Sequence, residues 1–421
     1  MKERTFKRIN EKIYEHTLDN GIKVFLYPFP KTKNFYVTIS VRYGSKYHKY
    51  KKGDSVYEII PGTAHFLEHK IMAVGENKVI SDRINKLGSL SNAWTGYETT
   101  NYNIFGSIDI NENIRLLLDM FYGPTFTKKD VDEEKGIISE EVDMGKDNIN
   151  KDLTERFYKN LFHNTHVKDI VTGEKSDLKK ITYSSLKRVY NDFYIPNNTF
   201  IVVTGNFDKD DVLDEIIKYY SKLKLKEKEL PKYIKPKEPQ TVKVQYEEVK
   251  KDSEEVRLKY ALKINKKLFK AKDDNLLMDY LNIILKINFG STSKNYEKYK
   301  DNQLAFGLSS YASKIEDYIL ITISAITSRP DDLIEELNKD IKLLTVEEKE
   351  FERKKKNVLR SFIMAFENIE DVEYSITDEY SSDKKIDYNE YDKLMSINYQ
   401  ELLRIMKLIK SDNVSIIRTV K

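Results

Sequence analysis

The strongest constraint on the fold is a change of composition near the middle of the chain. Between Lys222 and Lys251 the sequence turns to Lys, Glu and Pro, and its three prolines are Pro231, Pro236 and Pro239. Such a stretch is typical of a linker. The chain has 421 residues, of which 40% are hydrophobic, so it can bury a core on each side of this segment. We therefore predict a domain at 1–225, a linker at 226–245 and a second domain at 246–421.

The order of predicted elements starts again after the linker. In the first half, periodicity and turn residues predict strands at 14–27, 35–43, 91–110 and 200–205, and helices at 63–72, 80–87, 112–122, 130–144, 151–162, 183–194 and from 210. In the second half, they predict strands at 256–264 and 304–326, and helices at 274–287, 331–344 and 347–367. Similar charged segments begin at Thr127 and Thr345, which suggests an internal duplication. The alternative is two unrelated α/β domains.

Composition excludes several classes of protein. The chain has no cysteine, which rules out disulfides, thiolate nucleophiles and cysteine-ligated metals. Its net charge is only +4, with both signs mixed, which argues against a nucleic-acid-binding protein. No stretch approaches the ~20 apolar residues of a membrane span, and the first residues lack a signal-like apolar core. We expect a cytoplasmic protein with no membrane span and no nucleic-acid partner.

Histidines are scarce and unevenly placed. There are six, and all lie in the first half: His16, His48, His65, His69, His163 and His166. Two of them belong to the sequence His65-Phe-Leu-Glu68-His69, within a predicted helix. Residues at i, i+3 and i+4 share one helical face, so both imidazoles can chelate one zinc ion. Glu68 can then act as the general base that takes a proton from the attacking water. The alternative is a solvated helix face that binds no metal.

Catalytic zinc takes three protein ligands, so a third donor is needed. In the helix predicted at 130–144, Glu134, Ile137, Ile138 and Glu141 fall at i, i+3, i+4 and i+7, which places two carboxylates on an apolar stripe. Burying such groups is costly unless they are paired or bind a metal. We therefore predict Glu141 as the third ligand of one zinc ion per chain and Glu134 as a carboxylate that orients a ligand. Glu140 is the main rival to Glu141, and a solvated acidic face is the alternative.

These motifs resemble the pitrilysin and insulinase family of zinc peptidases, the inverzincins, which also contains the mitochondrial processing peptidases. Gly62-Thr-Ala-His65-Phe-Leu-Glu68-His69 matches the first family motif. Glu134-Lys-Gly-Ile-Ile-Ser-Glu-Glu141-Val-Asp-Met144 matches the second, in which the position of Glu141 is the zinc ligand. Further similarity lies at 18–21, 92–102 and 194–207, so it spans nearly the whole first half. The chain is most similar to bacterial members of about this length that act beside a catalytically inactive paralogue.

The resemblance implies an α+β fold of two homologous lobes. Each lobe would be a mixed, mostly antiparallel sheet with helices packed on one side, and the pair would form half of a clamshell that encloses peptides. Asn92, Ala93, Trp94 and Thr95 would belong to the edge strand that binds peptide substrate through main-chain hydrogen bonds. The plainer interpretation of Asn92 is a turn residue at the start of a strand.

The second half departs from the family pattern. Members usually carry an arginine and a tyrosine that contact the substrate carbonyl near zinc, but Lys300 and Phe306 stand at these positions. This favours a heterodimer with an inactive paralogue over a homodimer. We predict a zinc metalloendopeptidase that cleaves short or unfolded peptides, with peptide maturation as an analogy-based role. The alternatives are a non-catalytic peptide-binding or assembly subunit with a structural metal helix, and an unrelated α/β enzyme whose histidines bind no metal.

Overall fold

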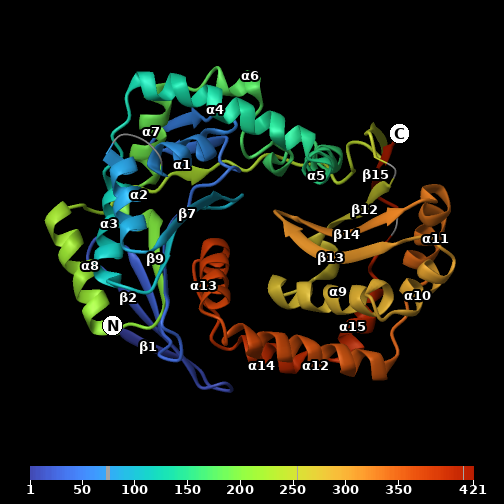
Figure 1. The fold of residues 1–421 in the computed structure, drawn as a ribbon. Helices are drawn as coiled ribbons and strands as arrows, with labels where there is room; N and C mark the ends of the chain where they lie inside the picture. The colour runs from blue at the N-terminus through green and yellow to red at the C-terminus, as the bar shows by residue number, and fades with distance from the viewer. Residues whose placement is uncertain (73–75, 254, 411) are drawn as a thin grey trace. The chain divides into compact units, whose positions relative to one another are not determined.

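The computed structural model describes residues 1–72, 76–253, 255–410 and 412–421. These residues form two compact units, each made of three chain segments (Figure 1). The first unit contains 1–145, 169–235 and 364–388. The second contains 146–168, 236–363 and 389–421. No helix among the described residues is long and apolar enough to cross a membrane.

A mixed sheet of seven strands forms the centre of the first unit, in the order β1-β2-β3-β9-β4-β8-β7. Only β3 and β9 pair in parallel, and the other neighbours are antiparallel. The strands are β1 (Lys2–Phe6), β2 (Glu11–Thr17), β3 (Lys23–Pro28), β4 (Phe35–Val41), β7 (Leu90–Thr95), β8 (Thr100–Gly106) and β9 (Thr199–Gly205). A small sheet of β5 (Lys49–Lys52), β6 (Ser55–Glu58) and β10 (Lys232–Tyr233) includes part of the predicted linker.

Most helices of the first unit share one core with one face of this sheet. Alternate residues of the central strands, such as Val37, Ile39 and Val203, point into that core. The helices are α1 (Thr63–Met72), α2 (Glu76–Lys86), α3 (Ile110–Tyr122), α4 (Lys128–Asp147), α6 (Lys175–Leu178), α7 (Tyr183–Phe193) and α8 (Lys209–Leu223). The sequence had indicated most of these helices to within a few residues.

One helix packs on the opposite face of the first sheet. This is α13 (Ile369–Asp383), which comes from the second half of the sequence (Figure 1). The ring of Tyr380 lies 4.9 Å from those of both Phe25 and Phe200, and Thr204 donates to the carbonyl of Ile369 at 2.8 Å. The sequence-based expectation of helices on one side therefore holds for the main core, while α13 adds a layer to the second face.

The second unit repeats this plan with five strands in the order β11-β15-β12-β14-β13. The strands are β11 (Tyr246–Lys250), β12 (Val256–Asn265), β13 (Gly307–Ile315), β14 (Tyr318–Thr327) and β15 (Val414–Val420). One face packs on α9 (Asp274–Phe289), α10 (Lys294–Asp301), α11 (Pro330–Lys342), α12 (Glu348–Ala365), α14 (Glu390–Ser396) and α15 (Tyr399–Met406). The other face is covered by α5 (Ile149–Leu161), through Leu153, Phe157 and Leu161.

Five strands correspond between the units in chain order and in position. The order β3-β9-β4-β8-β7 matches β11-β15-β12-β14-β13, and the first pair of each set is parallel. The α+β fold with two homologous lobes and mostly antiparallel sheets is thereby confirmed, as is the internal duplication.

The units differ from the ranges 1–225 and 246–421 at two equivalent places. Helix α5 follows α4 and joins the second unit, while α13 follows the equivalent helix α12 and joins the first. The reason is packing, because each helix covers the back of the sheet of the unit that it joins.

Candidate metal centre

Helix α1 carries the histidine motif and is buried on nearly all sides. Gly62 precedes it with φ +86°, and a Cβ there would lie 2.5 Å from the carbonyl oxygen of Thr172, so only glycine fits. Phe66 and Leu67 are fully buried in the core of the first unit. These contacts fix the helix, and His65, Glu68 and His69 project together from its remaining face.

The structure brings His65, His69 and Glu141 together. The Nε2 atoms of both histidines lie 3.5 Å from Oε2 of Glu141, and the two ring centroids are 4.5 Å apart. One ligand atom from each residue lies within 4.8 Å of the others. Helix α4 supplies Glu141 and thus faces α1 across the site.

This donor set fits zinc. Two imidazole nitrogens and one carboxylate oxygen are a common protein ligand set for catalytic zinc, with a fourth position left for water. A tetrahedral site with bonds of about 2.1 Å has ligand atoms about 3.4 Å apart. The two separations of 3.5 Å to Glu141 match that edge length.

Two carboxylates raise the affinity of His69 for protons. Burial lowers the pKa of His69, but its hydrogen bonds to Glu134 and Glu141 outweigh this effect and raise the pKa to about 9. The metal-free centre therefore holds His69 as an imidazolium at neutral pH, and a metal ion must displace that proton.

Glu134 is buried and divides its two oxygens between neighbouring residues of α1. Its Oε1 lies 3.0 Å from Nδ1 of His69, and its Oε2 forms an ion pair with Lys70. Burial would raise the pKa of Glu134, but the bonds from His69 and Lys70 hold it below the ordinary value. Glu134 thus contacts Nδ1 of His69, where a carboxylate can orient a metal-binding histidine.

Glu68 is buried beside the histidines. Burial raises its pKa, and a hydrogen bond from Thr95 counteracts part of that rise. Thr95 Oγ1 donates to Oε2 of Glu68 at 2.5 Å. A carboxyl group with a raised pKa, held next to two imidazoles, is suited to accept and return a proton.

The four residues predicted to bind substrate all lie on β7, at the edge of the first sheet. Asn92 and Trp94 are exposed, and Ala93 is half-buried. Thr95 differs from them, because its side chain contacts Glu68. An edge strand presents unpaired main-chain groups, so this placement agrees with peptide binding at 92–94.

The apolar stripe predicted on α4 is wrong in one residue. Ile137 is 57% exposed, and the buried residues are Val131, Glu134, Ile138, Val142 and Gly145. Ile137 and Glu140 lie on the exposed side of the helix. Among the described residues, the group on α1 and α4 that could hold a metal ion includes Glu141 and not Glu140. The buried stripe runs from Val131 through Glu134 and Ile138 to Val142, and Ile137 lies beyond its edge.

Lys70 is the residue that sequence reasoning missed. A lysine directly after a zinc-binding histidine carries no pattern of its own, and the only available signal was its place in a helix with few other charges. Lys300 and Phe306, at the positions of the expected arginine and tyrosine, are both exposed in the second unit.

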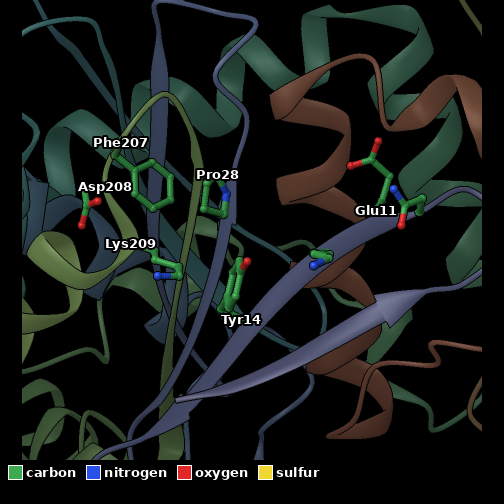
Figure 2. Close-up of a pocket in the computed structure, with 8 residues that line it drawn as sticks. Glu11, Tyr14, Pro28, Phe207, Asp208 and Lys209 are labelled. Carbon is green, nitrogen blue, oxygen red and sulfur yellow. The ribbon is translucent and has the colours of Figure 1, made fainter.

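A hollow elsewhere in the first unit lacks comparable chemistry. It has a volume of about 410 Å³ and lies beside the N-terminal hairpin and the start of α8 (Figure 2). Its two lysines are already paired, Lys12 with Glu3 and Lys209 with Asp210. It contains no histidine, so the centre on α1 and α4 is the best candidate for function.

Two family models match the chain. The insulinase (peptidase family M16) model covers residues 28–175, which include the whole candidate centre, and the peptidase M16 inactive-domain model covers 180–358. The chain belongs to the insulinase family, M16. The first family model contains every predicted metal ligand, whereas the inactive-domain model covers a stretch without histidine.

Two relatives and one solved structure match most of this chain over most of their own length. An uncharacterized zinc protease of Bacillus subtilis, YmfH, is 27% identical over 364 residues, or 83% of each chain. An uncharacterized zinc protease of Rickettsia felis is 25% identical over 94% of this chain and 92% of its own. A crystal structure described as M16-like peptidase, from Alicyclobacillus acidocaldarius, has a TM-score of 0.88 at 23% identity and covers 97% of this chain and 98% of that chain.

Proposed function

We propose that the chain is a zinc metalloendopeptidase that cleaves short or unfolded peptides. The observation that carries the proposal is the spacing of His65, His69 and Glu141, which matches a tetrahedral zinc site, with Glu68 beside it. The zinc-protease names of relatives that span most of the chain support it.

The chain's own residues divide the work of hydrolysis. A zinc ion held by His65, His69 and Glu141 would supply a Lewis acid and lower the pKa of a bound water. Glu68 accepts the proton of the attacking water and returns it to the leaving amine. Thr95 holds Glu68 in place, and the exposed main chain of 92–94 aligns the peptide as an added strand.

The test is the variant Glu68→Gln, measured for both zinc content and cleavage of an unstructured peptide. The amide keeps the shape of the side chain but cannot take the proton, so we expect full zinc content and a loss of roughly 10²–10⁴-fold in kcat. The matched control is Glu140→Gln, which directly precedes Glu141 but lies on the exposed side of α4 and should keep both. Cleavage at the wild-type rate by Glu68→Gln would refute the proposed base.

We further propose that the active form is a dimer that encloses the peptide, with a catalytically inactive paralogue as the favoured partner. The motivation is the exposed pair Lys300 and Phe306, which replaces the arginine and tyrosine expected to contact the substrate carbonyl. A paralogue could supply those groups. Maturation of a leader or modified peptide is the role we propose for this pair.

The same two residues support a second candidate function, a non-catalytic peptide-binding or assembly subunit. In that case the purified chain would hold one zinc ion per molecule and bind peptide but show no turnover, alone or with its partner. Turnover by the chain that Glu68→Gln abolishes would exclude this candidate.

A further inference from the structure

A buried lysine contacts Glu134, the carboxylate next to His69 of the candidate metal centre. Lys70 is only 2% exposed. Its ammonium group donates to the carbonyl oxygen of Asp130 at 3.0 Å and pairs with Oε2 of Glu134. Asp130 and Glu134 lie one turn apart on α4, so a single side chain of α1 joins α4 at two points.

The ion pair leaves Glu134 one arrangement in which both oxygens are used. With Oε2 occupied by Lys70, only Oε1 remains for His69, and it lies 3.0 Å from Nδ1. A carboxylate fixed in this way accepts the Nδ1 hydrogen and directs Nε2 toward Glu141, where its separation is 3.5 Å. Groups that orient a metal-binding histidine in this manner tune metal affinity.

We propose that Lys70 is a positioning residue of the zinc site, which acts through Glu134 to hold His69 in its ligand orientation. The proposal deepens the proposed function and rests on it only for the identity of the metal. The proposal explains why a lysine lies close to the metal site, although its positive charge would repel a divalent cation. The proposal therefore requires that Lys70 increases zinc affinity more by orienting Glu134 than it decreases that affinity by repelling the metal ion.

The two effects change zinc affinity in opposite directions, so an experiment can distinguish them. If Lys70 acts through Glu134, Lys70→Met should weaken zinc binding, by about 10–100-fold as for other residues that orient a metal ligand. If its charge acted directly on the metal, the same variant should bind zinc more tightly.

The experiment measures the zinc dissociation constant of the full chain by competition with a chelator. Four proteins are compared: wild type, Lys70→Met, Glu134→Gln and the double variant. We expect both single variants to weaken binding. In the Glu134→Gln background no carboxylate remains to be oriented, so Lys70→Met should then change the affinity by less than about threefold.

The melting temperature of each metal-free protein reports whether the variant folds. Should Lys70→Met fail to fold, Lys70→Arg keeps the charge and the comparison: its zinc affinity should stay closer to wild type than that of Glu134→Gln. Tighter or unchanged binding by a folded Lys70→Met, or equal weakening in both backgrounds, would overturn the inference. A wild type that binds no zinc would instead overturn the proposed function, and the inference with it.

Discussion

The side chain of Glu68 is held by a residue of the strand that would carry the substrate. Thr95 ends β7 and donates to Glu68 at 2.5 Å, while Asn92 and Trp94 of the same strand are exposed. Peptide added along this edge would therefore lie next to the group that fixes the general base. The same end of β7 would therefore align the substrate and orient Glu68.

Replacement of Thr95 by valine should slow catalysis without loss of metal. A hydrogen bond to a charged group contributes about 1.5–3 kcal/mol, so kcat should fall about tenfold or more, with KM nearly unchanged. Thr95→Ser keeps the hydroxyl and should restore most of the rate. Steady-state kinetics and zinc content decide the matter, and an unchanged kcat in Thr95→Val would show that the bond has no role in catalysis.

Zinc binding should release a proton from His69. Because its hydrogen bonds to Glu134 and Glu141 raise its pKa to about 9, the metal-free imidazole is protonated at about pH 7 and must become neutral to bind. Calorimetric titration in buffers of different ionisation enthalpy should show about one proton released per zinc from this residue.

The release should decline as the pH rises through the pKa of His69, and the apparent zinc affinity should rise over the same interval. Proton release that stays constant up to about pH 10 would contradict the raised pKa. Glu134→Gln, which removes one of the two carboxylate partners, should lower the pH at which the release declines.

At the residue scale, the histidine motif could be predicted from sequence because its spacing alone brings three side chains to one helical face. The choice of Glu141 over Glu140 followed from the same periodicity together with the family motif. Ile137 shows the limit of that reasoning. Periodicity assumes that every apolar residue marks the buried side, but Ile137 is exposed. It did place Glu134 on the buried side, and it could not show that Lys70 of another helix compensates that charge.

Among the elements, α5 is anchored to the second sheet by a buried ion pair. Lys263 of β12 is fully buried, pairs with Glu238 at 2.6 Å, and donates to the carbonyl oxygen of Leu161 at 2.9 Å. Glu238 accepts in turn from the main-chain nitrogens that follow α5, at His163, Asn164 and Thr165. The end of α5, the linker and the sheet therefore share one polar cluster.

Replacement of Lys263 should destabilise the folded protein. Lys263→Met leaves Glu238 buried without its cation, so the free energy of unfolding should fall by about 3–5 kcal/mol. Lys259→Met is the matched control. It lies on the same face of β12 and is half-buried, with its ammonium nitrogen 5.7 Å from the centre of the Phe157 ring. It should change stability by less than about 1 kcal/mol.

Denaturant unfolding gives the two free energies, and amide exchange locates the change. We expect Lys263→Met to expose the amides of α5 and of 236–245 first. Equal stability of the two variants would mean that the polar cluster contributes no more than the half-buried Lys259.

Helix α13 explains why the end of the chain gave no clear prediction. Its buried residues include Glu373, Thr377 and Ser381, because the sheet face beneath it carries Thr38, Ser40 and Thr204. Ile369, Val372 and Ile376 are buried as well, so α13 has a short apolar period that the polar residues interrupt and end. The strands and helices of the main cores, by contrast, carry regular apolar patterns, and their predicted positions agree with the structure to within a few residues.

For the whole molecule, the linker is one of several places where the chain passes between the two units. The chain passes from one unit to the other after residues 145, 168, 235, 363 and 388. The composition of the segment at 226–245 predicted a change of unit near 235, but it carried no information about the four other passages. These four passages depend on which sheet a helix packs against, and a local sequence pattern does not determine that packing.

A cut in the linker should therefore leave the protein in one piece. With a protease recognition sequence inserted after Lys226, which is exposed, cleavage yields one fragment that holds α5 and another that holds α13. Each helix is packed on a sheet formed mainly by the other fragment. We expect the cleaved protein to elute as the intact chain does in size-exclusion chromatography and to separate only in denaturant. Separation under native conditions would contradict the helix exchange.

The exchange of α5 and α13 also bears on how such a chain can arise. A half-length ancestor with one sheet and one such helix would leave the back of its sheet uncovered, unless two copies each placed that helix on the other. That arrangement is a domain-swapped dimer. Duplication followed by fusion would convert it into the present connectivity without moving a single helix, so the two lobes would never have existed as independent monomers.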